Sequence, residues 1–469
     1  MITRRLAVPP LRFDAVRAEL SVPAGFPADV LAEADAAARA PGGAGEPVDL
    51  PFVTIDPPGS TDLDQAVHLS ARPGGYRVRY AIADVAAFVR PGGAIDAEAR
   101  RRGLTQYSPD LRTPLHPTVL SEGAASLLPD QPRPAVLWTI DLDEAGAPAG
   151  VDCRRATVTS RAKLSYEQVQ RAFDAGTPPE PIALLRTIGE LRAAQARARH
   201  AIELDLPDQE VTAGEGGAWT IAFRAQLPVE RWNAELSLLT GMCAASIMLA
   251  GGVGLLRTMP PPREADVAQL RQIAPALGVD WPAGAAPGDV ISAVSGSGDP
   301  RHAAFLEQAA RLLRGAGYTA FAGTPPGQPA QSAVAAPYAH VTAPLRRLAD
   351  RFASEVCLAL AAGATPPDWA VQALPALPAT MAEADRHANE LERACVDLTE
   401  AWLLSGREGS VYDAVVVESH HDRATVHLAE PAVRATCDGA PLPLGAATRV
   451  RLTEADIDKR RVRFTRAGA

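Results

Sequence analysis

Three aspartates near the beginning of the chain have the spacing of a cation site. Asp56 ends an apolar run, the turn sequence PPGS follows at 57–60, and Asp62 and Asp64 stand at alternate positions behind it. In an extended segment, alternate side chains lie on one face, and the turn could bring Asp56 back beside them. Three close carboxylates repel one another, and a hard divalent cation with oxygen ligands relieves that repulsion. On the residues alone, the alternative is that these aspartates only cap backbone groups in a Pro/Gly/Ser turn.

Two other places in the sequence could contact a nucleic acid. Arg346 and Arg347 follow a Thr-Ala-Pro-Leu sequence at the start of a helical pattern, where backbone amides and the helix dipole favour a phosphate. The alternative is a solvated charge pair, and we favour the phosphate contact for Arg346. Tyr107 follows a Thr-Gln pair and could stack on a base, or it could be an ordinary surface aromatic.

The elements that position these residues follow from the hydrophobic pattern. Strand-like runs bounded by Pro/Gly turns cover 49–56, 65–71, 76–89 and 136–147. Helical periodicity covers 166–199, 230–256, 301–314 and 346–360. Strands and helices do not alternate, which favours an α+β core with a mixed or antiparallel sheet surrounded by helices.

The two ends of the chain differ from this core in the secondary structure that their sequences predict. Helical patterns at 13–20 and 27–40 predict a short helical N-terminal segment over 1–47, and the main α+β domain follows over 48–405. Residues 406–469 contain five short strand patterns separated by turn residues, which predicts an all-β barrel of the OB-fold type.

Composition excludes several classes of protein. The net charge is −9, so a general polyanion binder is disfavoured, although a local basic channel is compatible with it. Five cysteines without a CxxC pair disfavour zinc sites and a disulfide framework. We find no stretch of about 18 uncharged apolar residues, which excludes a membrane span. The N-terminus has no apolar run typical of a signal peptide, so we expect a cytoplasmic protein.

The acidic loop resembles the signature of the RNase II family, the proteins with an RNB domain, in which a first Asp is followed by an Asp-x-Asp-Asp cluster that binds magnesium. Further blocks similar to the family follow in the family's order. They are Tyr80–Ala86; Gly103–Tyr107 with Pro114, Pro117, Leu120-Ser121, Ser126–Pro129 and Arg133; Leu164–Glu167; and Tyr338–Arg347. Four separated blocks across most of the chain are a far more specific match than the acidic loop alone.

The resemblance implies a role for each matched residue. Asp56, Asp62, Asp64 and Gln65 would surround the metal, with Asp62 and Asp64 also acting in catalysis. Arg346 would bind the scissile phosphate and stabilise charge in the transition state. The RNA contacts that we expect are Tyr107, Arg347, Tyr166, Glu235 and Glu392. The last three have the least distinctive flanking sequence.

The chain departs from the family pattern in three places. Gln65 stands where the family's loop has its last Asp, which removes one full charge from the expected metal site. Gly241 stands where relatives often have a polar residue. The family usually has cold-shock OB barrels before the catalytic domain, and the segment before about residue 48 is too short for them.

The resemblance implies a Mg²⁺-dependent 3′→5′ exoribonuclease, in which Mn²⁺ could substitute for Mg²⁺. It would release nucleoside 5′-monophosphates from single-stranded RNA, and also from structured RNA with a 3′ tail, by two-metal-ion catalysis. We expect a monomer with no membrane contact and no nucleotide cofactor. The alternatives are a noncatalytic RNA-binding protein built on an inactivated RNB channel and an enzyme that trims only very short oligonucleotides.

Overall fold

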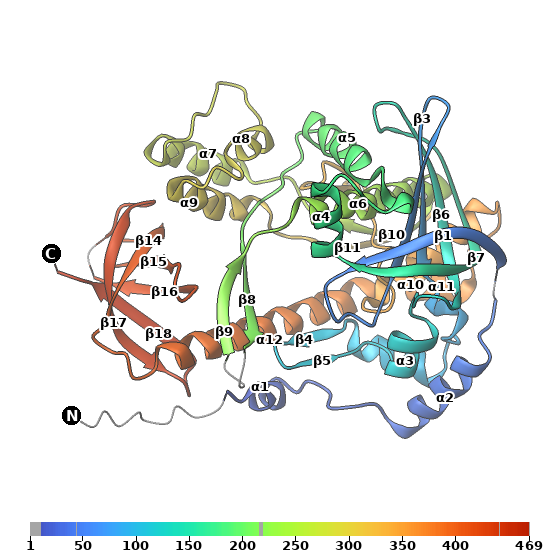
Figure 1. Ribbon diagram of the computed structural model, residues 1–469, viewed down its shortest axis with the longest axis horizontal. Coiled ribbons are helices and arrows are strands. Elements are labelled where there is room, and N and C mark those ends of the chain that lie inside the picture. The colour runs from blue at the N-terminus through green and yellow to red at the C-terminus, as the bar shows by residue number, and fades with distance from the viewer. Residues whose placement is uncertain (1–10, 44, 215–218, 440, 469) are drawn as a thin grey trace.

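The computed structural model describes residues 11–43, 45–214, 219–439 and 441–468. A mixed barrel with its covering helices lies at one end of the molecule and a second, all-β barrel at the other (Figure 1). The predicted α+β core with a C-terminal barrel and short N-terminal helices is confirmed. Residues 1–10 of the expected N-terminal segment lie outside the described residues.

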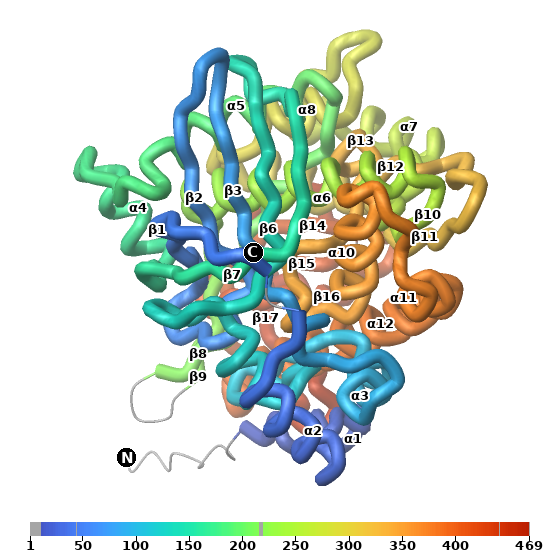
Figure 2. The backbone as a smooth tube through the Cα atoms, turned by 90° about the vertical axis from the view of Figure 1, so that its right-hand side faces the viewer, coloured from blue at the N-terminus to red at the C-terminus, as the bar shows by residue number. Residues whose placement is uncertain are grey.

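The first barrel contains the strands that end at the acidic loop. Its strands, in their order around the closed barrel, are β1 (Glu46–Asp56), β2 (Gln65–Arg72), β3 (Gly75–Ala83), β6 (Pro132–Asp143) and β7 (Pro148–Ser165). Figure 2 shows β2, β3, β6 and β7 side by side. β1 pairs in parallel with β7, so that Asp56 lies opposite Ser165 at the ends of the two strands. The mixed sheet predicted from the sequence therefore places the first aspartate directly beside the start of the next helix.

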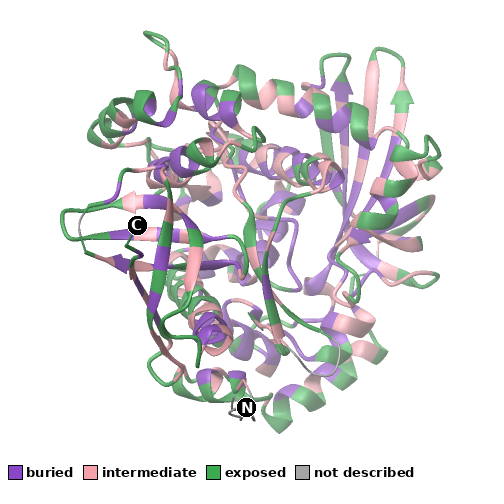
Figure 3. Ribbon diagram, turned by 60° about the vertical axis from the view of Figure 1, so that its left-hand side comes forward, coloured by how far each residue is buried: buried purple, intermediate pink, exposed green. Residues whose placement is uncertain are grey.

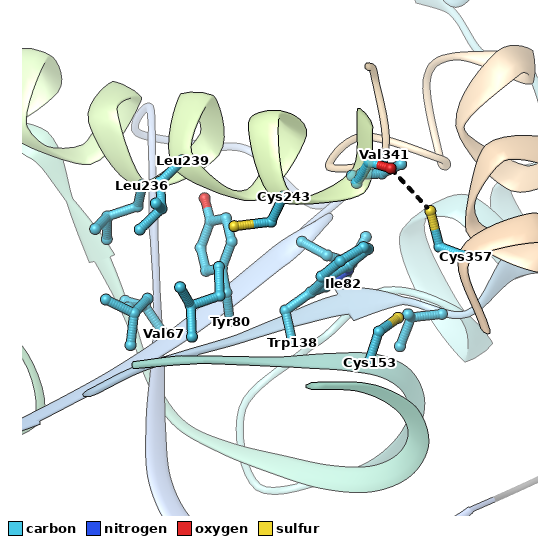
Figure 4. Packing of buried hydrophobic residues seen from close by; sticks show 14 of the residues in the cluster. Val67, Tyr80, Ile82, Trp138, Cys153, Leu236, Leu239, Cys243, Val341 and Cys357 are labelled. Atoms are coloured by element: carbon cyan, nitrogen blue, oxygen red, sulfur yellow. Dashed lines mark hydrogen bonds between the residues drawn. The ribbon is translucent and has the colours of Figure 1, made fainter. Parts of the chain in front are cut away.

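Helices pack against this barrel and against one another. The described residues form α1 (Phe13–Glu19), α2 (Ala28–Arg39), α3 (Ala94–Arg102), α4 (Tyr166–Asp174), α5 (Leu185–Ala198), α6 (Pro228–Gly251), α7 (Glu264–Ile273), α8 (Pro287–Val294), α9 (Pro300–Ala309), α10 (Leu348–Ala361), α11 (Asp368–Ala373) and α12 (Leu377–Leu404). Of these, α4, α6 and α10 contact the barrel strands directly. Leu236 and Leu239 of α6 lie over Val67 and Tyr80 of the barrel (Figure 4), and all four are at most 2% exposed. Buried residues run through the strands and the inward sides of the helices (Figure 3).

The sequence-based exclusion of a membrane span was too strong. Helix α6 is long and apolar enough to cross a membrane by length and composition, with a mean hydropathy of 1.5 in its most apolar window. In this fold it packs against the barrel and against α5 and α10, and it carries the polar side chains Asn233 and Glu235 at buried positions. Its apolar character is that of a core helix.

Three of the predicted helical segments have different limits in the structure. The segment 166–199 is interrupted between α4 and α5, where Gly176 has a φ of 71°. The segment 230–256 ends at Gly252, whose φ of 69° is the left-handed conformation that stops a helix, and the next residues form β10 (Val253–Thr258). The segment at 346 begins two residues later, because Arg347 is extended and caps α10. Periodicity alone does not distinguish the apolar residues of a strand that follows a helix from a continuation of that helix.

The described residues also form four two-stranded antiparallel sheets outside the barrels. They are β4 (Gln106–Ser108) with β5 (Leu111–Thr113), β8 (Asp208–Ala213) with β9 (Trp219–Arg224), β10 with β11 (Gly317–Ala322), and β12 (Ala330–Gln331) with β13 (Ala336–Pro337). We call the first of these the Tyr107 hairpin.

The second barrel follows the long helix α12. It closes through β14 (Val411–Ser419), β15 (Arg423–Leu428), β16 (Val433–Asp438), β18 (Arg461–Arg466) and β17 (Ala447–Asp456). The five strands confirm the barrel predicted from the sequence. Buried Glu400 of α12 accepts a hydrogen bond from the backbone N–H of Arg434, which fixes the barrel to the rest of the molecule.

Candidate active site

The acidic loop between β1 and β2 is fastened at Leu63 and at the backbone of Asp64. Between them, Leu63 is fully buried in the core, and its N–H donates to Ser126 Oγ at 2.9 Å. The N–H of Ala83 donates to the carbonyl of Asp64 at 2.9 Å. Because the apolar residue anchors the loop, the acidic residues on either side of it are held at fixed positions at the barrel end.

The three carboxyls carry charge that the protein compensates poorly. Burial, with repulsion from Asp62, raises the pKa of Asp56 to about 7, although Lys163 and Arg346 lie nearby. Burial raises the pKa of Asp64 to about 8 and also raises that of Asp62. Oδ2 of Asp56 is buried and has no hydrogen-bond partner. Such a set of oxygen donors suits a hard divalent cation, which would stabilise the ionised forms.

The carboxylates do not converge on one point in this structure. Among the described residues, no group of three or more His, Cys, Asp or Glu side chains is arranged to hold a metal ion. Instead, Asp62 pairs with the guanidinium of Arg112, and Asp64 lies 3.5 Å from Nε of Arg346. The donor set therefore fits a metal by its chemistry, with Asp62 and Asp64 paired with arginines here and Oδ2 of Asp56 left without a hydrogen-bond partner.

Arg346 lies in a turn near the end of a segment that we call the Arg346 segment, residues 338–347. The N–H of Leu345 donates to Oδ1 of Asp64 at 2.8 Å, and the carbonyl of Arg346 accepts from the N–H of Thr105 at 2.9 Å. The Arg346 side chain is 48% exposed. A partly exposed guanidinium beside a buried carboxylate is well placed to meet a phosphate.

Arg347 lies in a different environment from the one predicted. Its guanidinium pairs with Asp350, whose side chain is fully buried, through two hydrogen bonds of 2.5 and 2.8 Å. The same carboxylate accepts the N–H of Ala343 at 2.8 Å. Arg347 therefore fastens the Arg346 segment to α10. Among the described residues, the ion-pair partner of Arg347 is Asp350 and none of Asp56, Asp62 and Asp64.

The Tyr107 hairpin places an aromatic ring and a cation beside the aspartates. Tyr107 is 49% exposed, and its hydroxyl lies within electrostatic range of Asp62, Arg346 and Asp64. Burial of the hydroxyl, with Asp62 adding to it, raises the pKa of Tyr107 to about 12. Arg112 is its cross-strand partner, so both side chains share one face of the hairpin.

Sequence reasoning missed Arg112. Besides Asp62, its guanidinium contacts Glu122 at 2.9 Å and Thr61 Oγ1 at 2.9 Å. The register opposite Tyr107 was a signal for it, since Pro109-Asp110 predicts a tight turn. Sequence reasoning also missed Lys163, which lies near Asp56. Its signal was rarity, since the chain has only two lysines.

The remaining predicted contacts lie in three different places. Tyr166, the first residue of α4, lies near Asp56 and is 3.5 Å from Nδ2 of Asn233, a residue that the sequence analysis did not select. Glu235 is half a turn away from Asn233 on α6, so it faces another direction. It lines a cavity between α5, α6 and α8, and burial, offset by nearby Arg192, raises its pKa to about 7. Glu392 of α12 is exposed and lies near Cys395 of the same helix.

Gln65, the first residue of β2, has both ends of its side chain engaged by protein groups. Nε2 donates to the carbonyl of Thr342 at 2.7 Å, and Oε1 accepts from the hydroxyl of Tyr80. Ser237 Oγ lies 3.0 Å from that hydroxyl. The structure thus brings Asp56, Asp62, Asp64, Gln65, Arg346, Tyr107 and Tyr166 to one place and puts Arg347, Glu235 and Glu392 elsewhere.

Comparison with known proteins gives a family model for most of the chain. Residues 47–359 match the RNB domain, and residues 410–467 match the RNase II-type exonuclease C-terminal S1 domain. Ribonuclease R of Aquifex aeolicus is 31% identical over 237 residues, which are 48% of this chain and 34% of that protein. Exoribonuclease 2 of Erwinia tasmaniensis is 34% identical over 212 residues, which are 42% of this chain and 33% of that protein. The matches thus span about a third of these two relatives.

Solved structures of Mycoplasma genitalium RNase R share the fold. The apo form superimposes with a TM-score of 0.86 and 21% identity, covering 97% of this chain and 78% of that chain. A complex of the same protein with double-stranded RNA gives a TM-score of 0.83 and 22% identity, covering 97% and 83%.

Proposed function

The chain belongs to the RNB-domain family of RNase II-type exonucleases, and from this membership and the geometry of the acidic loop we propose that it is a Mg²⁺-dependent 3′→5′ exoribonuclease. The substrate is single-stranded RNA, or structured RNA with a 3′ tail, and the products are nucleoside 5′-monophosphates. The observation that carries the proposal is the meeting of Asp56, Asp62 and Asp64 with Arg346 and Tyr107 at one barrel end.

The reaction needs a nucleophilic water, charge neutralisation at phosphorus and a stabilised leaving group. Water oxygen bonds to phosphorus, the bond from phosphorus to O3′ of the upstream nucleotide breaks, and that oxygen takes a proton. Mg²⁺ ions held by Asp56, Asp62 and Asp64, with Mn²⁺ as a substitute, would supply the activated water and the stabilisation of both oxygens in a two-metal arrangement.

The residues around the loop supply substrate binding. Arg346 neutralises the negative charge that develops on the phosphate, because its guanidinium is fixed and partly exposed beside Asp64. Tyr107 stacks on the 3′-terminal base, and stacking accepts any base, which suits a nuclease that acts on all sequences. Tyr166, with Asn233 beside it, is the candidate contact for the terminal ribose, since RNA is distinguished from DNA by its 2′-hydroxyl.

A second function, RNA binding without turnover, is favoured by one observation. Gln65 stands in place of the family's fourth carboxylate and is bound by protein groups. RNA labelled at its 5′ end, incubated with Mg²⁺ or with EDTA, separates the two. Shortening from the 3′ end with release of 5′-monophosphates in Mg²⁺ alone supports the nuclease, and tight binding with an intact substrate supports the noncatalytic function.

A further inference from the structure

The amide of Gln65 lies between the acidic loop and the Arg346 segment. Its Nε2 donates to the backbone carbonyl of Thr342, four residues before Arg346, at 2.7 Å. A carbonyl oxygen accepts only, so this partner determines which end of the amide is the nitrogen. The oxygen end then faces the hydroxyl of Tyr80, which is 1% exposed and donates to it.

From this arrangement we infer that Gln65 is a positioning residue for Arg346 and is not a metal ligand. The inference rests on the proposed function, because it concerns how that site is assembled. An oxygen that accepts from Tyr80, with Ser237 Oγ at 3.5 Å, already has two protein groups around it. Coordination of a cation by that oxygen would have to compete with the buried Tyr80 hydroxyl, which would lose this acceptor and keep only Ser237 Oγ at 3.0 Å.

A carboxylate at position 65 could not make the same contacts. It has no N–H to donate to Thr342, and it would place negative charge against a carbonyl oxygen. Asp is also one methylene shorter than Gln. The amide therefore fastens the Arg346 segment in a way that the family's carboxylate could not.

The Gln65 contact is one of several that fasten the Arg346 segment. Upstream, the N–H of Ala339 donates to the carbonyl of Gly241 at 3.1 Å. A Cβ on Gly241 would lie 2.2 Å from the Tyr338 ring and 2.5 Å from the Ala339 carbonyl oxygen, so only glycine permits this approach. Downstream, Asp350 and Asp64 accept the N–H groups of Ala343 and Leu345. Between these two sets of contacts, Gln65 contacts the carbonyl of Thr342 from β2.

The two accounts of Gln65 differ most for a neutral substitution of similar length. For Gln65→Met, loss of a positioning contact predicts a kcat at least tenfold lower and a Mg²⁺ dissociation constant within about threefold of the original. Loss of a metal ligand predicts weaker Mg²⁺ binding. Calorimetric titration of the full chain with Mg²⁺, without RNA, measures that constant, and steady-state hydrolysis of labelled RNA measures kcat and KM.

Three further variants help to separate a positioning role of Gln65 from a role as metal ligand. Tyr80→Phe removes the donor to Oε1, and we expect a smaller loss of kcat with unchanged Mg²⁺ binding. Gln65→Asp restores the family's carboxylate, and we expect kcat to fall even if Mg²⁺ binds more tightly, because the added charge attracts the cation without restoring the contact to Thr342. Gln195→Glu is the matched control, since Gln195 also donates to a backbone carbonyl, that of Ala145, and none of its recorded contacts involves the acidic loop. This variant should retain kcat.

Mg²⁺ binding weakened by more than about threefold in Gln65→Met, or a kcat for Gln65→Asp at or above that of the unsubstituted chain, would overturn the inference. If the unsubstituted chain hydrolyses no RNA in Mg²⁺, the proposed function fails separately. The assignment of Gln65 is then decided by calorimetry and thermal unfolding. Unchanged Mg²⁺ binding with a lower melting temperature supports it, and weakened binding refutes it.

Discussion

The backbone N–H of Leu345 donates a 2.8 Å hydrogen bond to the carboxylate of Asp64, a residue 281 positions earlier in the chain. This bond places Arg346, the next residue, with its Nε 3.5 Å from the other oxygen of the same carboxylate. A nucleic-acid phosphate that reaches the acidic loop would therefore meet a guanidinium and the proposed metal ligands together. The predictions below test how these parts act.

The adjacent arginines Arg346 and Arg347 should have different roles. We expect Arg346→Gln to lower kcat by about 10²–10³-fold with little change in melting temperature, because its side chain acts on charge in the transition state. Arg347→Gln leaves the buried Asp350 carboxylate unpaired, which costs about 3–5 kcal/mol, so its melting temperature should fall by several degrees. Thermal unfolding and steady-state kinetics of both variants decide this. An Arg347→Gln protein of normal stability with weakened RNA binding would show that Arg347 contacts RNA after all.

Stability without metal should fall as the pH rises toward 8. The pKa values of Asp56 and Asp64 in the folded chain are about 7 and about 8, above the ordinary value of 3.8. The folded chain therefore keeps protons that the unfolded chain releases above about pH 4, and this contribution to stability is lost as the pH rises through 7 and 8.

Urea unfolding in EDTA at pH 5, 6.5 and 8 measures this dependence. The Asp64→Asn variant, which has one fewer titrating carboxyl, should show a smaller decline than the unsubstituted chain. Added Mg²⁺ should reduce the decline in the unsubstituted chain, because a cation favours the ionised carboxylates. Equal slopes for the two proteins in EDTA would mean that Asp64 titrates normally.

Helix α1 should influence RNA binding through the Tyr107 hairpin. Arg17 of α1 donates to Ser108 Oγ at 2.7 Å and to Asp110 Oδ2 at 3.0 Å in the turn of that hairpin. We expect Arg17→Ala to raise KM severalfold with a small effect on kcat. The hairpin that carries Tyr107 loses its hydrogen bonds to α1, whereas the contacts of the acidic loop are unchanged. The double variant Arg17→Asp/Asp110→Arg should recover part of the loss. Arg12→Ala, which breaks the exposed pair with Asp14 near the same helix, is the control. Equal KM values for all these proteins would contradict the coupling.

Selection of RNA over DNA should depend on Asn233 more than on Glu235. Asn233 contacts the hydroxyl of Tyr166, whereas Glu235 faces Arg192 on the other side of α6. We expect Asn233→Ala to reduce the ratio of kcat/KM for ribose-ended over deoxyribose-ended oligonucleotides by about threefold or more, and Glu235→Gln to change it less than twofold. The opposite order would restore the role that the resemblance implied for Glu235.

Much of the fold and part of the site could be predicted from the sequence because their signals are local. The turn after Asp56 and the alternation at Asp62 and Asp64 are features of a few consecutive residues. The partners of Gln65 could not be predicted in this way, since Thr342 is 277 positions away and only the folded chain brings it near. The pairing of Arg347 with Asp350 could not be predicted from its phosphate-binding signal, because a helix start is equally the position from which it reaches Asp350 three residues later.

The most direct test of this account is hydrolysis of a 5′-labelled single-stranded RNA by the unsubstituted chain and by Asp64→Asn, each in Mg²⁺ and in EDTA. Asp266→Asn, which changes a half-buried aspartate paired with the exposed Arg263, is the matched control. We expect the unsubstituted chain and the control to shorten the RNA from its 3′ end in Mg²⁺ only. Asp64→Asn should bind RNA with similar affinity and hydrolyse it with a kcat below about a tenth of the original, a loss above about 1.4 kcal/mol of transition-state stabilisation. An Asp64→Asn protein that keeps more than that tenth, or an unsubstituted chain that leaves the RNA intact in Mg²⁺, would contradict the account.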